Sequence, residues 1–214
     1  MKLTASEKTG QGIILALMAA LVAITLYPLL HVFFAAVSEP GRLVSHRGLI
    51  LAPLGLSAQP FELLFNNPFI LGGLINSLLL ILFGVSLNIL MTAIAAYVLS
   101  KRYALLVKGC TVVIIFTMLF SGGLVPLYLT VKSLGLYNSF ASLVVPFAIN
   151  TFNLIILRTA FEGVPASLDE SARIDGAGHF TILFRITIPL VMPMIAVLVV
   201  DYAVERWNGW FYAS

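Results

Sequence analysis

The residues best suited to chemistry in this chain are few and lie mostly in its C-terminal third. Asp201 and Glu205 are one helical turn apart, and Asn150 and Asn153 are three residues apart, so each pair would share a helix face. The histidines have no metal-binding spacing with cysteines or acids, which predicts no metal site. No nucleophile–base pattern and no Gly-x-x-x-x-Gly-Lys-Ser/Thr motif occurs. We therefore expect neither catalysis nor a cofactor in this chain.

Each polar pair has two interpretations. In an apolar segment, Asn150 and Asn153 could hydrogen-bond between helices or contact a sugar in a pathway. Asp201 and Glu205 could be functional intramembrane acids, or could lie at the outer surface beside Arg206. The sequence alone leaves both choices open.

Aromatic residues near the C-terminal end are also ambiguous. Trp207, Trp210 and Tyr212 fit an interfacial belt of a membrane protein, although aromatic rings also stack on sugars. The neighbouring Asn208 adds an amide to the same group.

The most patterned polar stretch is the segment 159–185. Pro165 is suited to start a helix, and Asp169 pairs with Arg173 at i+4. Gly176 and Gly178 then interrupt the helix, since glycine readily adopts the left-handed conformation of a helix end. The pattern predicts a short helix, a glycine bend and a second arm. A helix lying along the headgroups and a helix that docks on another protein both fit it.

The elements that position these residues follow from composition. The chain has 214 residues, of which 60% are apolar and only 10% charged, and its mean hydropathy is +1.06. Soluble domains are about 25% charged. The composition therefore predicts an integral membrane protein and excludes disorder. The net charge of +3 comes from few, scattered residues, so we expect no nucleic-acid partner.

Charge-free stretches predict an all-α, polytopic helical bundle formed by a single transmembrane domain over residues 1–214. A spanning helix needs about 20 mostly apolar residues. The five expected spans are 12–37, 70–99, 109–130, 138–158 and 186–208. Basic residues divide eight to four in favour of a cytoplasmic N-terminus. Segment 159–185 is then cytoplasmic, and segment 38–69, rich in proline and glycine, is an external loop of turns and short pieces.

Segment 159–185 resembles the EAA loop of permease subunits of binding-protein-dependent ABC importers, the MetI-like transmembrane family. Ser171 stands where the family has alanine, and Ile188 where it has leucine. The matching residues are Glu170, Ser171, Ala172, Asp175, Gly176, Ala177, Ile186, Ile188 and Pro189.

Other segments are similar to the carbohydrate-importing branch of that family. They are 95–102, 121–126, 134–136, 150–153 with Arg158, and the pair Trp207-Asn208. This resemblance implies an oligosaccharide substrate, with Asn150, Asn153, Trp207 and Asn208 as candidate pathway residues. It also implies six spans, so a sixth is expected beyond the five identified.

The resemblance implies a non-catalytic subunit of the bacterial inner membrane. Its expected partners are membrane lipid, a second permease, two ATP-binding subunits holding ATP and Mg²⁺, and an extracytoplasmic solute-binding protein. The coupling residues would be Glu170, Ser171, Ala172, Asp175, Gly176 and Ala177. Among these, Glu170 would form an ion pair with the ATPase, Ala172 would be small to fit against it, and Gly176 would allow a bend and close approach.

Two other classes stay open. A self-contained carrier or channel would need no ATPase, and an inverted repeat would favour it, but none is visible. A membrane-enzyme subunit has little support, and a small solute other than an oligosaccharide is an alternative substrate.

Overall fold

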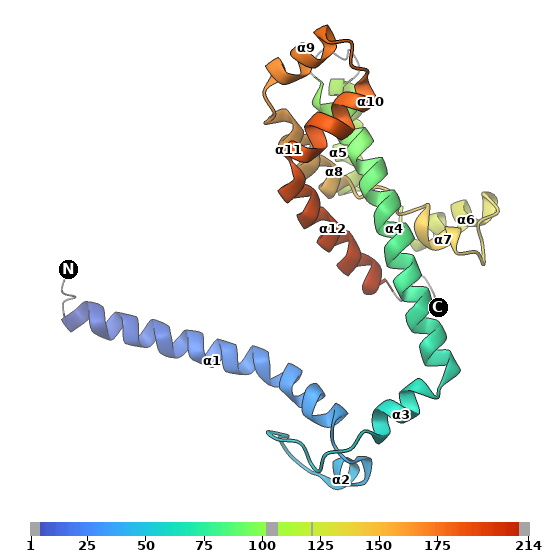
Figure 1. The fold of residues 1–214 in the computed structure, drawn as a ribbon. Coiled ribbons are helices and arrows are strands. Elements are labelled where there is room, and N and C mark those ends of the chain that lie inside the picture. Colours follow the sequence, from blue (N-terminus) through green and yellow to red (C-terminus); the bar gives the residue numbers. More distant parts are fainter. Residues whose placement is uncertain (1–4, 102–106, 121, 210–214) are drawn as a thin grey trace. The chain divides into compact units, whose positions relative to one another are not determined.

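The computed structural model describes residues 5–101, 107–120 and 122–209. Within these ranges the chain is helical and contains no strand, only an isolated bridge between Ser38 and Leu56. It divides into two compact units, Met1–Gly73 and Leu74–Ser214 (Figure 1). These residues show the all-helical class that the charge-free stretches of the sequence predict.

The N-terminal unit consists of one long apolar helix followed by a tied loop. Helix α1 spans Ala5–Ala36, and the loop holds the short helices α2 (Pro40–Ser45) and α3 (Gln59–Phe65). The buried Ser38 hydroxyl donates to Phe34 O at 2.5 Å and accepts from Leu54 N at 2.9 Å. One side chain thus joins the end of α1 to the far side of the loop, which otherwise consists of turns and short helices, as its prolines and glycines predict.

The C-terminal unit contains most of the helices. Helix α4 (Pro68–Ser100) begins in the first unit and runs through the second. The others are α5 (Val107–Leu119), α6 (Leu124–Ser133), α7 (Ala141–Val144), α8 (Thr151–Glu162), α9 (Ala166–Ile174), α10 (His179–Ile182), the π-helical turn η1 (Leu183–Thr187), α11 (Ile188–Leu190) and α12 (Met192–Trp207).

Only two described helices are long and apolar enough to cross a membrane alone, Gly10–Ala36 and Pro68–Ser100. They coincide with the predicted spans 12–37 and 70–99. The number rises to at most four if the broken pairs 107–133 and 179–207 each count as one span. The count of five spans and the cytoplasmic N-terminus therefore stay predictions.

The remaining predicted spans differ from the sequence expectation because proline and asparagine interrupt them. The stretch 138–158 contains the four-residue α7 and the beginning of α8, separated by a non-helical segment that includes Pro146 and ends at Asn150. The stretch 186–208 begins inside a helical arm, 179–190, which meets α12 at an angle of 87°. Since proline lacks an N–H and disfavours helical geometry before it, absence of charge does not guarantee one continuous helix.

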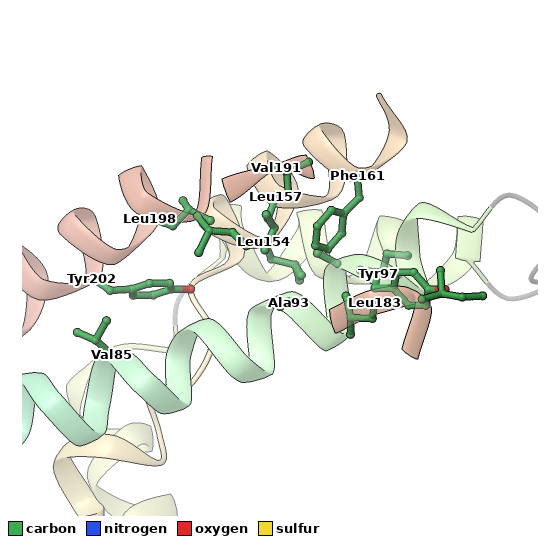
Figure 2. Close-up of a cluster of buried hydrophobic side chains, with 14 of the residues drawn as sticks. Val85, Ala93, Tyr97, Leu154, Leu157, Phe161, Leu183, Val191, Leu198 and Tyr202 are labelled. Atoms are coloured by element: carbon green, nitrogen blue, oxygen red, sulfur yellow. The ribbon is translucent and has the colours of Figure 1, made fainter. Parts of the chain in front are cut away.

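One apolar core holds the C-terminal unit together. Figure 2 shows side chains from α4, α8, η1 and α12 converging on it. Ala93 and Ala96 of α4 are 1% and 0% exposed, and such small residues let neighbouring helices approach closely. The labelled members are Val85, Ala93, Tyr97, Leu154, Leu157, Phe161, Leu183, Val191, Leu198 and Tyr202.

Candidate functional site

The predicted loop helix is α9, which Figure 1 shows at one end of the C-terminal unit beside α10. Pro165 precedes the helix as its N-cap, with φ −56° and ψ 128°, and Ala166 is the first helical residue. Proline was expected at the first helical position itself. The helix still begins at this proline because its fixed φ suits the entry to a first turn.

The C-terminal end of α9 is a Schellman motif. Gly176 adopts φ +80°, its N–H donates to Arg173 O at 3.0 Å, and the N–H of Ala177 donates to Ala172 O at 2.9 Å. These are the two backbone bonds of that motif, and they require a left-handed residue at Gly176. A Cβ at this position would meet no atom within 4 Å. The predicted glycine bend is therefore present, and the space beside it is open.

The EAA-type residues divide between an inner and an outer side. Ala172 is only 8% exposed and belongs to the apolar core, and Ala177 is partly buried against it. Glu170, Ser171, Asp175 and Gly176 are exposed. The structure thus gives a reason for the small side chain of Ala172 that differs from the expected fit against a partner: it packs inside this chain.

The outer side of this region exposes apolar side chains next to Glu170. Ile174 lies one helical turn after Glu170 and is 85% exposed. Phe180 of α10 is 68% exposed, and Leu168 is also exposed, although it lies on the helix face of Ala172. Glu170 and Ile174, with the bare backbone at Gly176, form a mixed apolar and acidic surface. Exposed apolar patches of this kind mark sites of interaction.

The inner side of α9 is attached to the end of α4. The Asp169 carboxylate lies 2.8 Å from Lys101 Nζ, accepts a hydrogen bond from the Tyr97 hydroxyl at 3.4 Å, and lies 3.2 Å from Arg173 Nη2. The pair with Arg173 is the i+4 pair that the sequence predicts. The contacts with Lys101 and Tyr97 were not foreseen, because those residues lie about 70 positions earlier and no local pattern joins them.

The second arm of the loop returns into the same core. Ile182 and Leu183 are 1% and 2% exposed, and Ile186 and Ile188 are half-buried. The backbone over Leu183–Thr187 is π-helical, a form that often occurs at functional positions. The matched Ile186, Ile188 and Pro189 therefore lie on a packed arm that leads to the bend before α12.

The predicted pathway amides have structural partners. The buried Asn153 donates through Nδ2 to Asp201 Oδ2 at 2.9 Å, which is the interhelical bond weighed for it. Asn150 is the N-cap of α8, since its Oδ1 accepts from Phe152 N at 2.9 Å. Its own N–H donates to the Tyr202 hydroxyl at 3.2 Å. The Asn150 side chain also donates through Nδ2 to Glu205 Oε2 at 3.5 Å, so the two amides reach acids one turn apart on α12, and a role in sugar contact stays a prediction.

The residues at the end of α12 are more open. Trp207 is 55% exposed, and Asn208 is the exposed C-cap, with Nδ2 donating to Val204 O at 3.0 Å. Trp210 and Tyr212 lie outside the described residues. Asp201 and Glu205 are exposed on α12, and in the described part of the chain neither lies within 4 Å of a basic group.

One of the two interpretations of these acids places them at a surface beside Arg206, but Arg206 points into the protein. It is 8% exposed, and its guanidinium donates to Leu143 O at 2.8 Å, Phe147 O at 2.6 Å and Asn88 Oδ1 at 2.9 Å. A Cβ on Gly84 would lie 3.2 Å from Arg206 Nε, so the glycine makes room for the side chain. Arginine has a planar fork of donors, so one side chain can bind several carbonyls where the chain breaks between α7 and α8.

Within the described residues, no group of three His, Cys, Asp or Glu side chains is arranged to hold a metal ion. The arrangement on α9 is instead that of an interaction site: an exposed face, a defined bend and a fixed inner attachment.

Comparison with known proteins places this arrangement in context. Residues 88–211 match the family described as the inner membrane component of binding-protein-dependent transport systems. A polygalacturonan/rhamnogalacturonan transport system permease protein, YtcP of Bacillus subtilis, is 39% identical over 92% of this chain and 68% of its own length. LplC of Bacillus subtilis is 37% identical over 89% of this chain and 64% of its own length. The chain thus spans about two thirds of the length of these relatives.

A solved structure is also similar. It is a bacterial ABC transporter involved in the import of the acidic polysaccharide alginate, with a TM-score of 0.92 and 28% identity over 98% of this chain and 74% of that chain.

Proposed function

The chain belongs to the family of inner membrane components of binding-protein-dependent transport systems, and we propose that it couples ATP hydrolysis in a separate subunit to sugar import through α9. It is a non-catalytic membrane permease subunit of the carbohydrate-importing branch. The family's own description makes it dependent on a binding protein, which favours an assembled importer over a self-contained carrier.

The observation that carries the proposal is the two-sided construction of α9. Its inner side is attached through Asp169 and Ala172, whereas its outer side presents Glu170, Ile174 and the open backbone at Gly176. A helix that is fixed on one side and exposes apolar and charged groups on the other is suited to dock in a groove of a second protein. Glu170 then forms an ion pair at the rim, and Ile174 fills the groove.

The assembly that we propose contains this permease, a second permease, two ATP-binding subunits and an extracytoplasmic solute-binding protein. ATP and Mg²⁺ bind in the ATP-binding subunits. Closure of those subunits on ATP draws the two docked helices together, and the spans alternate between inward-open and outward-open forms.

The substrate that we propose is an oligosaccharide from an acidic polysaccharide. The names of the relatives support this, since YtcP is named for polygalacturonan and the solved transporter for alginate. In this chain the exposed polar groups of α12 and its C-cap are Asp201, Glu205 and Asn208, which suit hydroxyl groups, and the two acids would repel a uronate carboxylate. Charge-neutralising groups for the carboxylates would then come from the second permease or the binding protein. A competition assay tests this choice by comparing how strongly oligogalacturonides and neutral raffinose each inhibit transport.

The coupling role is tested by co-purification of the full-length chain with its candidate ATP-binding subunit in detergent. Wild type would be compared with Glu170→Lys and Gly176→Trp on the outer side of α9. Glu62→Lys is the matched control, because it makes the same charge change on the exposed face of another short helix, α3.

We expect wild type and Glu62→Lys to retain the ATP-binding subunit, and the two α9 variants to lose it. Equal retention by all four proteins would show that α9 is not the docking surface. If wild type does not retain the subunit, a self-contained carrier becomes the favoured function.

A further inference from the structure

Four segments of the C-terminal unit meet at the Tyr97 side chain, which is 5% exposed near the end of α4. Its ring packs edge-on against Phe161 of α8 and against His179 of α10, both at 6.4 Å between centroids. Lys101 Nζ lies 4.3 Å from the ring centre, and the hydroxyl reaches Asp169 of α9. Figure 2 shows Tyr97 of α4 and Phe161 of α8 in one cluster. Movement of any of these segments must therefore disturb this junction.

The ion pair between Lys101 and Asp169 is the most enclosed of those in the described residues. The two side chains are 18% and 16% exposed, compared with 23% and 28% for Arg158–Glu162 and 68% and 49% for Arg42–Glu39. Enclosure weakens screening by salt and water, so the pair resists separation more than a surface pair does. The cation also lies over the Tyr97 ring, which limits its freedom further.

The backbone leaves helical geometry on either side of α9. The helix follows Pro165, which has an extended ψ of 128°, and it ends at Gly176 in the left-handed conformation. Packing of Ala172 adds contact, but a single methyl group gives little directional restraint. Without a side-chain link, α9 could swing between these two points. Asp169 supplies that link, and its neighbour Glu170 points to the other side.

We propose that Asp169 is a positioning residue which, with Lys101, transmits displacement of α9 to α4. This inference rests on the proposed function, because it presumes that α9 docks on an ATP-binding subunit. Glu170 then makes the contact with the partner, and Asp169 passes the movement into the membrane-spanning part. Of these two adjacent acids, Glu170 thus binds the partner and Asp169 transmits the movement.

The test uses the assembled transporter in proteoliposomes, with oligogalacturonides and alginate oligosaccharides as probes. Retention of the ATP-binding subunit, basal ATP hydrolysis and its stimulation by the loaded binding protein are measured together. We expect Asp169→Asn and Lys101→Met to keep retention and basal hydrolysis but to lower stimulation at least about fivefold, the lower end of typical coupling between sites. Asp169→Glu and Lys101→Arg keep the charges and should keep most of the stimulation.

The double variant Lys101→Met/Asp169→Asn separates transmission from stability. It removes both members of the enclosed pair, and only the more exposed Arg173 loses a contact. It therefore carries the test even if a single variant fails to assemble, and its loss should not exceed that of either single change. Glu162→Gln is the matched control, since it removes an ion pair of similar exposure that lies within α8 and does not touch α9.

Normal stimulation in the double variant, or an equal loss in Glu162→Gln, would overturn the role of Asp169. If wild type itself does not retain the ATP-binding subunit, the proposed function fails instead. The two failures are therefore distinguishable.

Discussion

Replacement of Gly176 by alanine tests the conformational reason for a glycine at the end of α9. At φ +80° an L-residue costs roughly 1–2 kcal/mol, because its Cβ crowds its own backbone. No other atom lies within 4 Å of the added Cβ, so no clash adds to that cost. A change of 1–2 kcal/mol raises the open fraction of the helix end roughly 5- to 30-fold. Asparagine tolerates the left-handed region better, so Gly176→Asn should cost less than Gly176→Ala.

Hydrogen exchange of the backbone amides of Gly176 and Ala177 measures this effect directly. Their bonds to Arg173 O and Ala172 O form only while the left-handed turn is kept. Gly178→Ala is the matched control, since Gly178 has φ −74° and also has open space around its Cβ position. The reasoning is refuted if Gly176→Ala leaves exchange unchanged, or if Gly178→Ala accelerates it as much.

Three further substitutions probe the polar contacts of the C-terminal unit by thermal unfolding in detergent. Asn150→Ala removes the N-cap of α8 and should cost about 1 kcal/mol, and an unchanged midpoint would contradict the capping role. Tyr202→Phe leaves the buried Thr92 hydroxyl without its 2.8 Å partner, and a loss of roughly 1–3 kcal/mol is expected. Gly84→Val places side-chain atoms against Arg206 and should cost about 1–3 kcal/mol, whereas a neutral result would mean that the guanidinium moves freely.

Much of the candidate site could be predicted because its signals are local. A short helix after Pro165 and a left-handed stop at Gly176 follow from residue types a few positions apart, and both are present. The i+4 pair of Asp169 and Arg173 is present for the same reason. The membrane class follows from composition alone, and the family match confirms it.

Other features could not be predicted because they depend on tertiary contacts. The Lys101–Asp169 pair joins residues 68 positions apart, and Arg206 reaches carbonyls about 60 positions away. Sequence spacing does not show that Asn150 is the N-cap of α8, nor that both amides reach acids of α12 about 50 positions later. The break after α7 was likewise not predicted, because the absence of charged residues does not indicate where the backbone hydrogen bonds of a helix end.

The same break explains why an arginine is buried in an apolar unit. After α7 the chain is not helical again until α8, and side chains bind carbonyls of this stretch: Asn88 Nδ2 donates to Phe147 O at 3.1 Å. Backbone polar groups at membrane depth need such partners, because a bilayer core offers no water. Arg206 donates to the carbonyls of Leu143 and Phe147 and to Asn88 of α4, so one side chain closes the break and joins α12 to α4. Just past the C-terminal end of α4, Lys101 joins this helix to α9. Helix α4 is thus held by one cation near its middle, at the broken helix, and by another at its C-terminal end, at the docking helix, and it can relate movement at one site to the other.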